Sequence, residues 1–403
     1  MHCRVVGLAL WVWAAGTSAA ADDLPQEVIL LAHFKQAIRR ALSQVPNYTC
    51  LETVERYGAE HHGVSFRPLD NVQLEISSVG DKELLAWPGA RRFDESDIEG
   101  FTAGGMMSSG VFATHARSVF LADTTMIRYH GEEDLAGRMT ARYDFHVSQA
   151  WSGYQIRANG ATARVGTVGS FWVDPGSLEL IRLEVRAEQL PAALGIESST
   201  TDIDYARMRI GETDVLLPQT AQLLTALVSG DSWRNDIGFS HCRAYSTESS
   251  IRFDMPETQP ANAVAAVRQV ELPAGLMITI ALETPIDSGT ALVGDVLHGR
   301  VTEDVRRKGK TIVPKGALAA GRIRGFARVP SPEPGIDLTV EFQELEWEGA
   351  RAQFYGEMLP QESAGRVHIP GTGVLHLKAR FQLATGFKTT WRTFEPNQRG
   401  LTK

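Results

Sequence analysis

Apolar and polar residues alternate along most of the chain, which is the period of a β-strand with one buried face. Between residues 48 and 248 the alternating runs are divided by turn-forming residues such as Asn159-Gly160 and Asp174-Pro175-Gly176. The second of these turns joins two runs into a predicted hairpin. The strands predicted in this region span residues 48–58, 71–79, 82–88, 125–131, 138–148, 153–158, 164–174, 178–188, 200–209, 214–226 and 238–248.

One segment has a helical period instead. Residues 24–45 place apolar side chains, among them Phe34 and Ile38, at i, i+3 and i+4 spacing on one face. Pro25 and Pro46 stand where the first turn and the end of a helix are expected. A second, shorter helix is predicted within residues 110–122. The N-terminal region is thus predicted to be a helix followed by antiparallel strands with one helical insertion.

This order of elements resembles the lipoprotein-carrier fold of the LolA and RseB type. The pairing of residues 171–175 with residues 178–185 is similar to the central hairpin of that family. The resemblance implies a half-open antiparallel barrel closed over a helix. It also implies that an apolar concavity binds acyl chains or a protein partner.

A second β-rich region begins with two loops of one form, Leu272-Pro273-Ala274-Gly275 and Val313-Pro314-Lys315-Gly316. In each loop a proline fixes φ shortly before a glycine that tolerates positive φ, as in a type II turn. Each loop opens an alternating run, and Gly309 suits a hairpin turn between them. Short strands at this spacing predict a small antiparallel barrel or sandwich. Further strands are predicted at residues 336–348, 350–358 and 374–384.

These turn residues, together with Thr284-Pro285-Ile286 and Gly294-Asp295, resemble the TrbI-like β-barrel domain. That domain occurs in the core subunits of type IV secretion and conjugation machines. The resemblance implies an envelope β-domain that works through protein–protein contact and without catalysis.

The chain is therefore predicted to be mainly β, with an N-terminal helix plus antiparallel half-barrel followed by a smaller antiparallel β-barrel or sandwich. Pro256 and Pro260 indicate an extended connection between the two parts. The predicted segments are a signal peptide at 1–21, a lipoprotein-carrier-like domain at 22–253, a linker at 254–271, a TrbI-like domain at 272–394 and a frayed tail at 395–403.

The first residues have the pattern of a secretory signal peptide. Arg4 gives a positive start, residues 5–15 an apolar core, and residues 18–21 a small-residue cleavage site. The apolar core is too short to span a bilayer as a helix. We therefore expect an exported protein, periplasmic or extracellular, whose contact with a membrane is peripheral at most.

Removal of the leader takes Cys3 with it and leaves Cys50 and Cys242. An even pair of cysteines in an oxidising compartment is a candidate disulfide. The alternative is two separate buried thiols.

The charge balance bears on the class of partner. The formal net charge is −8, and the only dense basic run is Arg306-Arg307-Lys308-Gly309-Lys310. Nucleic acid is therefore not expected as a partner. The hydrophobic content of 43% and charged content of 22% are those of an ordinary globular protein.

The sequence contains no strong catalytic or metal-binding motif. His61-His62 and the group around His130 lack the spacing of zinc ligands. A Ser108, His115 and Asp123 set stays open, because catalytic triads assemble in space rather than in sequence. We expect no cofactor and no metal.

Glu344, Glu346 and Glu348 alternate along one predicted strand and so share a face. Three carboxylates on one face could bind a cation or serve as the acid–base pair of a glycosidase. They could equally be the solvated side of an edge strand.

Aromatic and thioether side chains gather around a glycine-rich segment: Trp87, Phe101, Met106, Met107 and Phe112. Such flexible apolar groups suit a lid or an adaptable ligand-binding mouth. The alternative is that they pack in the core. A second aromatic group, Trp151, Tyr154, Phe171 and Trp172, is predicted to lie inside the barrel.

The leading functional hypothesis is an exported, non-catalytic envelope protein. Its N-terminal concavity would bind an apolar ligand, such as a lipid or a lipoprotein acyl chain, or an envelope protein segment. Its C-terminal β-barrel would dock a partner. The alternatives are a periplasmic hydrolase with an unrecognised site and a structural subunit of an envelope assembly.

Overall fold

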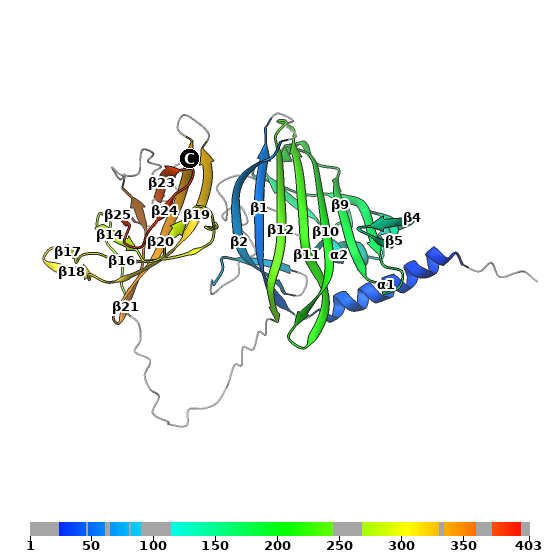
Figure 1. The fold of residues 1–403 in the computed structure, drawn as a ribbon, viewed down its shortest axis with the longest axis horizontal. Coiled ribbons are helices and arrows are strands. Elements are labelled where there is room, and N and C mark those ends of the chain that lie inside the picture. Colours follow the sequence, from blue (N-terminus) through cyan, green and yellow to red (C-terminus); the bar gives the residue numbers. More distant parts are fainter. Residues whose placement is uncertain are drawn as a thin grey trace, which may run out of the picture.

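The computed structural model describes residues 24–45, 47–60, 65–79, 82–89, 114–244, 268–329, 334–359 and 373–395. The predicted signal peptide lies outside these residues, as do most of the predicted linker and of the tail. The described chain is mainly β, as predicted, and its strands form two large sheets (Figure 1). We refer to residues 24–244 as the N-terminal module and to residues 268–395 as the C-terminal module.

The N-terminal module is a ten-stranded sheet in the order β3-β2-β1-β12-β11-β10-β9-β8-β5-β4. Every neighbouring pair in it is antiparallel. Its strands are β1 (Tyr48–Ala59), β2 (Arg67–Val79), β3 (Lys82–Ala86), β4 (Met126–Leu135), β5 (Arg138–Val147), β8 (Gly166–Val173), β9 (Leu180–Glu188), β10 (Ile196–Ile210), β11 (Thr213–Leu227) and β12 (Ser232–Ala244). A small hairpin, β6 (Gln155–Ala158) with β7 (Ala161–Arg164), and the short 3₁₀ helix η2 (Ala192–Leu194) complete the module.

Two helices pack on one face of this sheet because they present aromatic side chains to it. Helix α1 (Gln26–Gln44) buries Phe34 and Ile38, and helix α2 (Thr114–Phe120) buries Phe120. The rings of Phe34 and Phe120 lie 5.4 and 5.1 Å from the ring of Phe171 on β8. Each fully buried phenylalanine contributes roughly 1.5–3 kcal/mol through the hydrophobic effect. The helical spacing of apolar residues in the sequence therefore predicted the buried face of α1 correctly.

The opposite face of the sheet carries charged cross-strand pairs. Arg182 on β9 binds Asp204 on β10 at 2.7 Å, and Gln222 on β11 donates to Asp236 on β12 at 2.8 Å. These side chains are partly exposed, so each pair adds only about 0–1 kcal/mol to stability. Their position identifies this face as the solvent side.

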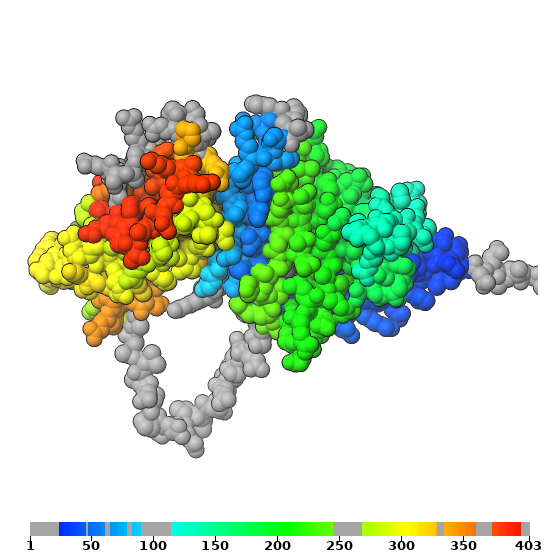
Figure 2. All heavy atoms as spheres, viewed as in Figure 1, coloured from blue at the N-terminus to red at the C-terminus, as the bar shows by residue number. Residues whose placement is uncertain are grey.

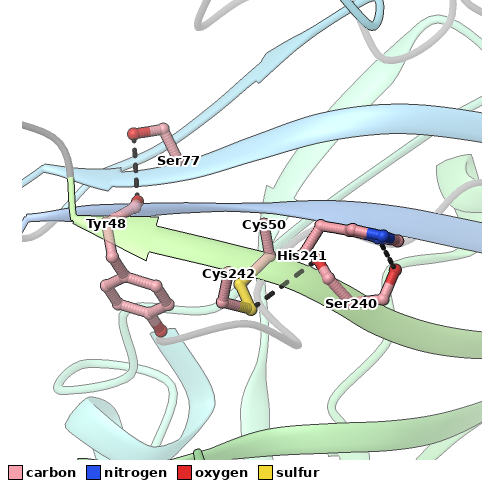
Figure 3. The surroundings of a disulfide bond; sticks show 6 residues. All are labelled: Tyr48, Cys50, Ser77, Ser240, His241 and Cys242. Carbon is pink, nitrogen blue, oxygen red and sulfur yellow. Dashed lines mark hydrogen bonds between the residues drawn. A yellow bond between two sulfur atoms is a disulfide. The ribbon is translucent and has the colours of Figure 1, made fainter. Parts of the chain in front are cut away.

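Cys50 and Cys242 are joined by a disulfide, so the predicted bridge is present (Figure 3). The bond links β1 to β12 at a β-bulge, where the register shifts between Thr49 and Leu51. His241 has φ +51° at this point. A bulge inserts one extra residue into one strand and re-aims the side chains beside it.

The C-terminal module is a nine-stranded sheet in the order β13-β21-β20-β19-β16-β14-β25-β22, with β23 paired to β20. Two two-stranded pieces, β15-β24 and β17-β18, accompany it. Its strands are β13 (Arg268–Gln269), β14 (Met277–Leu282), β15 (Ile286–Asp287), β16 (Val296–Val301), β17 (Val305–Arg307), β18 (Lys310–Val313), β19 (Leu318–Val329), β20 (Gly335–Trp347), β21 (Ala350–Gln353), β22 (Gly356–Met358), β23 (Gly373–Lys378), β24 (Gln382–Leu383) and β25 (Lys388–Thr393).

The turn chemistry of this module is as predicted. Gly275 and Gly316, which end the two proline-containing loops, have φ of +81° and +86°. Gly309 has φ +77° and lies between β17 and β18. The core behind these turns is built around Trp391, whose ring packs edge-on against Phe342 at 5.6 Å.

Three details differ from the predictions. Trp151 is 65% exposed and is not inside the barrel, because it belongs to the turn between β5 and β6. Trp172 is buried on the charged face of the sheet, with the guanidinium of Arg142 over its ring at 5.1 Å. Strand β13 lies within the range predicted as linker and pairs in parallel with β21.

Candidate functional site

The concave face of the N-terminal sheet carries one unbroken row of apolar side chains. Each member stands directly opposite the next one on the neighbouring strand. All are at most 7% exposed. We call this row the apolar belt; from β2 to β5 it consists of Val72, Val54, Ile237, Ala221, Ile203, Leu183, Phe171 and Tyr143.

The belt forms because every strand keeps the same alternation in register. A slip of one residue in any strand would turn its belt residue to the solvent side. Helix α1 covers the belt at the β8 end, where Phe34 stacks on Phe171 and the hydroxyl of Tyr143 donates to the backbone oxygen of Glu27 at 2.9 Å. Helix α2 adds Val119 and Phe120. Within the described residues, two helices cover the belt, and one of them is only seven residues long.

Buried polar side chains flank the belt on both sides. On β1, Glu52 precedes Val54 by two residues and Arg56 follows it by two, so all three point to the concave face. Arg56 is 3% exposed and donates to both oxygens of Asp70 on β2, at 2.6 and 2.5 Å. Glu52 is also 3% exposed. The concavity is therefore apolar in its middle and polar at its two ends.

The pKa of Glu52 is raised to about 8, first by burial and then by the nearby carboxylate of Glu83. At neutral pH Glu52 therefore keeps its proton. Glu83 lies on β3, and its Oε1 accepts hydrogen bonds from the backbone N–H and the hydroxyl of Thr114, at 2.9 and 3.2 Å. It thereby caps the first residue of α2, where a negative charge is favourable.

Two tyrosines complete this end of the concavity. Burial and the charge of Glu83 raise the pKa of both Tyr48 and Tyr205. Among the described residues, the buried hydroxyl of Tyr205 has no hydrogen-bond partner. Such a group costs about 1–3 kcal/mol when it stays unsatisfied.

The set of Ser108, His115 and Asp123 that the sequence left open is not assembled in the part of the chain that the structure describes. Ser108 lies outside that part, and Asp123 pairs with Arg39 of α1. His115 is 2% exposed, its ring lies 4.6 Å from the ring of Tyr154, and burial lowers its pKa to about 4. His115 is therefore a neutral histidine packed inside the module.

Of the predicted ligand-binding residues, Phe101, Met106, Met107 and Phe112 lie outside the described residues. Trp87 is described, and it lies where the two modules meet. The guanidinium of Arg324 on β19 stands over its ring at 4.9 Å. The role of these five predicted residues as a lid or binding mouth stays a prediction.

The modules meet along the edge of β2 (Figure 2). Val293 of the C-terminal module bridges Val72 in parallel. The bridge rests on two backbone hydrogen bonds of 2.8 Å, from Gln73 to Val293 and from Val293 to Asn71. The C-terminal module thus adds a short segment to the edge of β2 next to the apolar belt, and so protects an edge that could pair with another chain.

Gly294 and Arg322 hold this contact. Gly294 has φ +105°, and a Cβ placed there would come within 2.5 Å of the backbone oxygen of Gln73. Only glycine fits such a close approach of two backbones. Arg322 donates to the backbone oxygens of Pro88 and Gly294 at 2.8 and 3.1 Å, and burial lowers its pKa.

The alternating carboxylates of β20 do not form an open cation site. Arg351 on β21 binds Glu344 at 3.3 Å and Glu346 at 3.1 Å. Within the described residues no cluster of histidine, cysteine and carboxylate side chains has the arrangement of a metal site. No described helix is both long enough and apolar enough to cross a membrane.

Sequence reasoning did not single out Glu52 and Tyr205, which are buried polar side chains. The available signal was the alternation of β1, which puts Glu52 on the same face as Cys50 and Val54. A carboxylate at an inward position of an otherwise apolar strand is an unusual feature.

No known family model matches the chain, and no curated protein matches it significantly. Solved structures resemble it at low identity. A domain named for outer membrane lipoprotein sorting, from Vibrio parahaemolyticus, is 12% identical over 54% of this chain and 93% of its own, with a TM-score of 0.32. A LolA superfamily protein from Nitrosomonas europaea is 11% identical over 53% of this chain and 94% of its own, with a TM-score of 0.28. A chain of the Pseudomonas aeruginosa MucA/MucB complex is 11% identical over 93% of this chain and 95% of its own, with a TM-score of 0.18.

Proposed function

We propose that the protein is an exported, non-catalytic carrier or sensor that binds an apolar ligand or protein segment along the apolar belt. The C-terminal module would dock a partner in the cell envelope. The observation that carries this proposal is the belt itself, a continuous apolar row across eight strands of a concave sheet.

The way in which the belt is covered supports a binding role. An isolated helix as short as α2 is not stable by itself in water, so its place depends on packing and on its cap. An acyl chain offers the same kind of contact as Val119 and Phe120 and could take their place. The energy of exchanging one apolar cover for another is small compared with that of exposing the belt to water.

Export is supported by the leader pattern and by the disulfide. A bond between Cys50 and Cys242 fits an oxidising compartment, where disulfides form and persist. The periplasm or the extracellular space is therefore the proposed location.

The binding role can be tested by titrating the purified protein with dodecanol, a neutral single-chain probe, in a calorimeter. Ala221→Leu adds bulk in the middle of the belt and should weaken binding about tenfold, since misplaced core volume costs 1–3 kcal/mol. Ala226→Leu is the matched control, because Ala226 lies on the same strand with its side chain on the other face.

If wild-type protein takes up no dodecanol, or if both variants bind it as the wild type does, the belt is not the binding site. An organic extract of the protein as purified, analysed by mass spectrometry, should contain a single-chain or acylated lipid. Turnover of an ester or glycoside probe by the protein would favour a hydrolase instead.

A further inference from the structure

A short hairpin projects from the C-terminal module and carries the dense basic run of the sequence. We call residues 305–313 the basic hairpin. Its strands β17 and β18 pair with each other and form a sheet apart from the nine-stranded one. Val305 and Val313 at its base are 5% and 0% exposed, and they anchor it to the core. The hairpin lies at one end of the long axis, on the side of the C-terminal module that faces away from the N-terminal module (Figures 1 and 2).

Four cations occupy the tip of the basic hairpin. All four are exposed, namely Arg306, Arg307, Lys308 and Lys310. Arg306 has a carboxylate partner, Asp304, at 3.1 Å. The other three cations form no ion pair with any residue that the structure describes. Three positive charges are therefore available to a partner outside the chain, although the chain as a whole has a formal net charge of −8.

The placement of these cations is unfavourable for the hairpin itself. Arg307 stands directly opposite Lys310, and like charges directly opposite each other in a sheet are destabilising. Lys308 and Gly309 form the turn with φ of +50° and +77°. A two-residue turn with positive φ at both positions favours Asn, Asp or Gly at the first position, whereas this chain has a lysine there. Local rules of this kind are broken mainly at functional sites, so the cations indicate a role beyond the fold.

We propose that the basic hairpin docks the protein on an anionic lipid surface, with Arg307, Lys308 and Lys310 among the phosphate head groups. Basic segments are attracted to anionic bilayers by charge, without a binding pocket. The inference names the partner of the C-terminal module and in that respect rests on the proposed function. Ligand binding at the apolar belt does not depend on it.

A bilayer surface fits the basic hairpin better than an acidic protein does. A stable protein interface buries about 800 Å² on each partner and has an apolar, well-packed centre. The apolar side chains of the hairpin do not supply such a centre, because Val305 and Val313 are buried and Ile312 packs against the core. The tip from Arg306 to Thr311 offers exposed charged and polar side chains and one glycine. A layer of head groups requires neither an apolar centre nor a matching shape.

The test is co-sedimentation of the exported protein, without its predicted leader, with two kinds of vesicle. One kind contains phosphatidylcholine alone, and the other contains equal parts of phosphatidylcholine and phosphatidylglycerol. We expect binding to the anionic vesicles and little binding to the neutral ones. Raising the ionic strength from about 0.1 M to about 1 M shortens the Debye length from about 10 Å to about 3 Å and should abolish the binding.

The variant that carries Arg307→Gln, Lys308→Asn and Lys310→Gln removes the three unpaired charges. Asparagine tolerates positive φ, so the turn is kept. Each Lys or Arg near an anionic surface is worth about fivefold in affinity, so the triple variant should bind the anionic vesicles about a hundredfold more weakly. It should be no less stable to heat than the wild type, because it removes the repulsion between positions 307 and 310.

The matched control removes three exposed cations from the N-terminal module, through Arg128→Gln, Arg157→Gln and Arg209→Gln. It changes the net charge of the chain as much as the triple variant of the hairpin does. The control should bind the anionic vesicles as the wild type does. Equal losses in the two variants would show that net charge alone decides the binding, and would overturn the docking surface.

Other outcomes contradict the inference directly. Equal binding of the wild type to both kinds of vesicle, or equal binding of the wild type and the triple hairpin variant, would overturn it. Binding of poly-glutamate but not of vesicles would assign the basic hairpin to an acidic protein instead.

Titration of the same samples with dodecanol keeps the two proposals apart. Normal uptake of dodecanol without binding to anionic vesicles would overturn this inference and leave the apolar belt as the proposed ligand site. Binding to anionic vesicles through the hairpin without uptake of dodecanol would support this inference and overturn the belt.

Discussion

Glu52 makes the stability of the protein depend on pH in a defined direction. Its pKa is raised to about 8 in the folded state, so the folded protein holds a proton that the unfolded chain releases near pH 4.5. A group of this kind stabilises the fold at low pH and loses that contribution as the pH rises to its folded pKa.

Burial of His115 makes the stability of the protein depend on pH in the opposite direction. Its pKa is lowered to about 4 by burial, so its contribution to stability is present above pH 6.5 and is lost as the pH falls through 4. Between pH 6.5 and pH 8, therefore, Glu52 alone of the two changes stability.

We expect the free energy of unfolding of the wild type to fall by about 2 kcal/mol between pH 6.5 and pH 8, at about 1.4 kcal/mol per pH unit for one proton. Glu52→Gln cannot ionise and should lose this slope. Urea denaturation at several pH values measures it, with Glu55→Gln as the control. A variant that keeps the wild-type slope would show that Glu52 is ionised in the fold.

A substitution at Gly294 tests whether the turn that contacts β2 holds the two modules together. We expect Gly294→Ala to detach the Leu292–Asp295 turn from β2, because its Cβ would meet the backbone oxygen of Gln73 at 2.5 Å and its φ of +105° disfavours a side chain. Small-angle scattering should then report a larger radius of gyration.

Gly153→Ala is the control for this substitution, since a Cβ at Gly153 meets nothing within 4 Å. It should leave the scattering curve unchanged. If Gly294→Ala scatters as the wild type does, strand addition at β2 does not hold the modules together.

The elements show what the sequence could and could not predict. Alternation predicted most strands, and prolines placed α1 close to its limits, because burial on one face and the chemistry of helix ends are local signals. The turns at Gly275 and Gly316 were predicted for the same reason. A local alternation predicts where a strand lies in the sequence, but it does not predict which strands pair with it.

Contacts that join distant parts of the chain were therefore missed. Val72 and Val293 meet although more than 200 residues separate them in sequence, and the guanidinium of Arg324 from the other module stands over the ring of Trp87. Alternation also cannot tell which of two faces another element covers. That is why Trp151 was assigned to the interior and the burial of Glu52 was not predicted.

At the scale of the whole molecule, the disulfide closes a long loop. Cys50 and Cys242 are 192 residues apart and tie the first strand of the N-terminal sheet to its last. Cross-linking a loop of this length restricts the unfolded chain and stabilises the fold by up to about 5 kcal/mol in the chain-entropy model.

We expect the double variant Cys50→Ser with Cys242→Ser to lower the free energy of unfolding by about 2–5 kcal/mol. Reduction of the wild type should lower it equally, and the variant should not respond to the reductant. Equal stability of the oxidised and reduced wild type would show that the bridge does not hold β1 against β12.

The proposed binding role depends on where a ligand lies in the protein. Photo-crosslinking the protein with an alkyl chain that carries a diazirine, followed by peptide mapping, measures this directly. We predict labels on peptides that contain the belt residues of β8, β9 and β10, namely Phe171, Leu183 and Ile203, and their loss when excess dodecanol is added. Labels confined to the charged face of the sheet or to the C-terminal module would contradict the account.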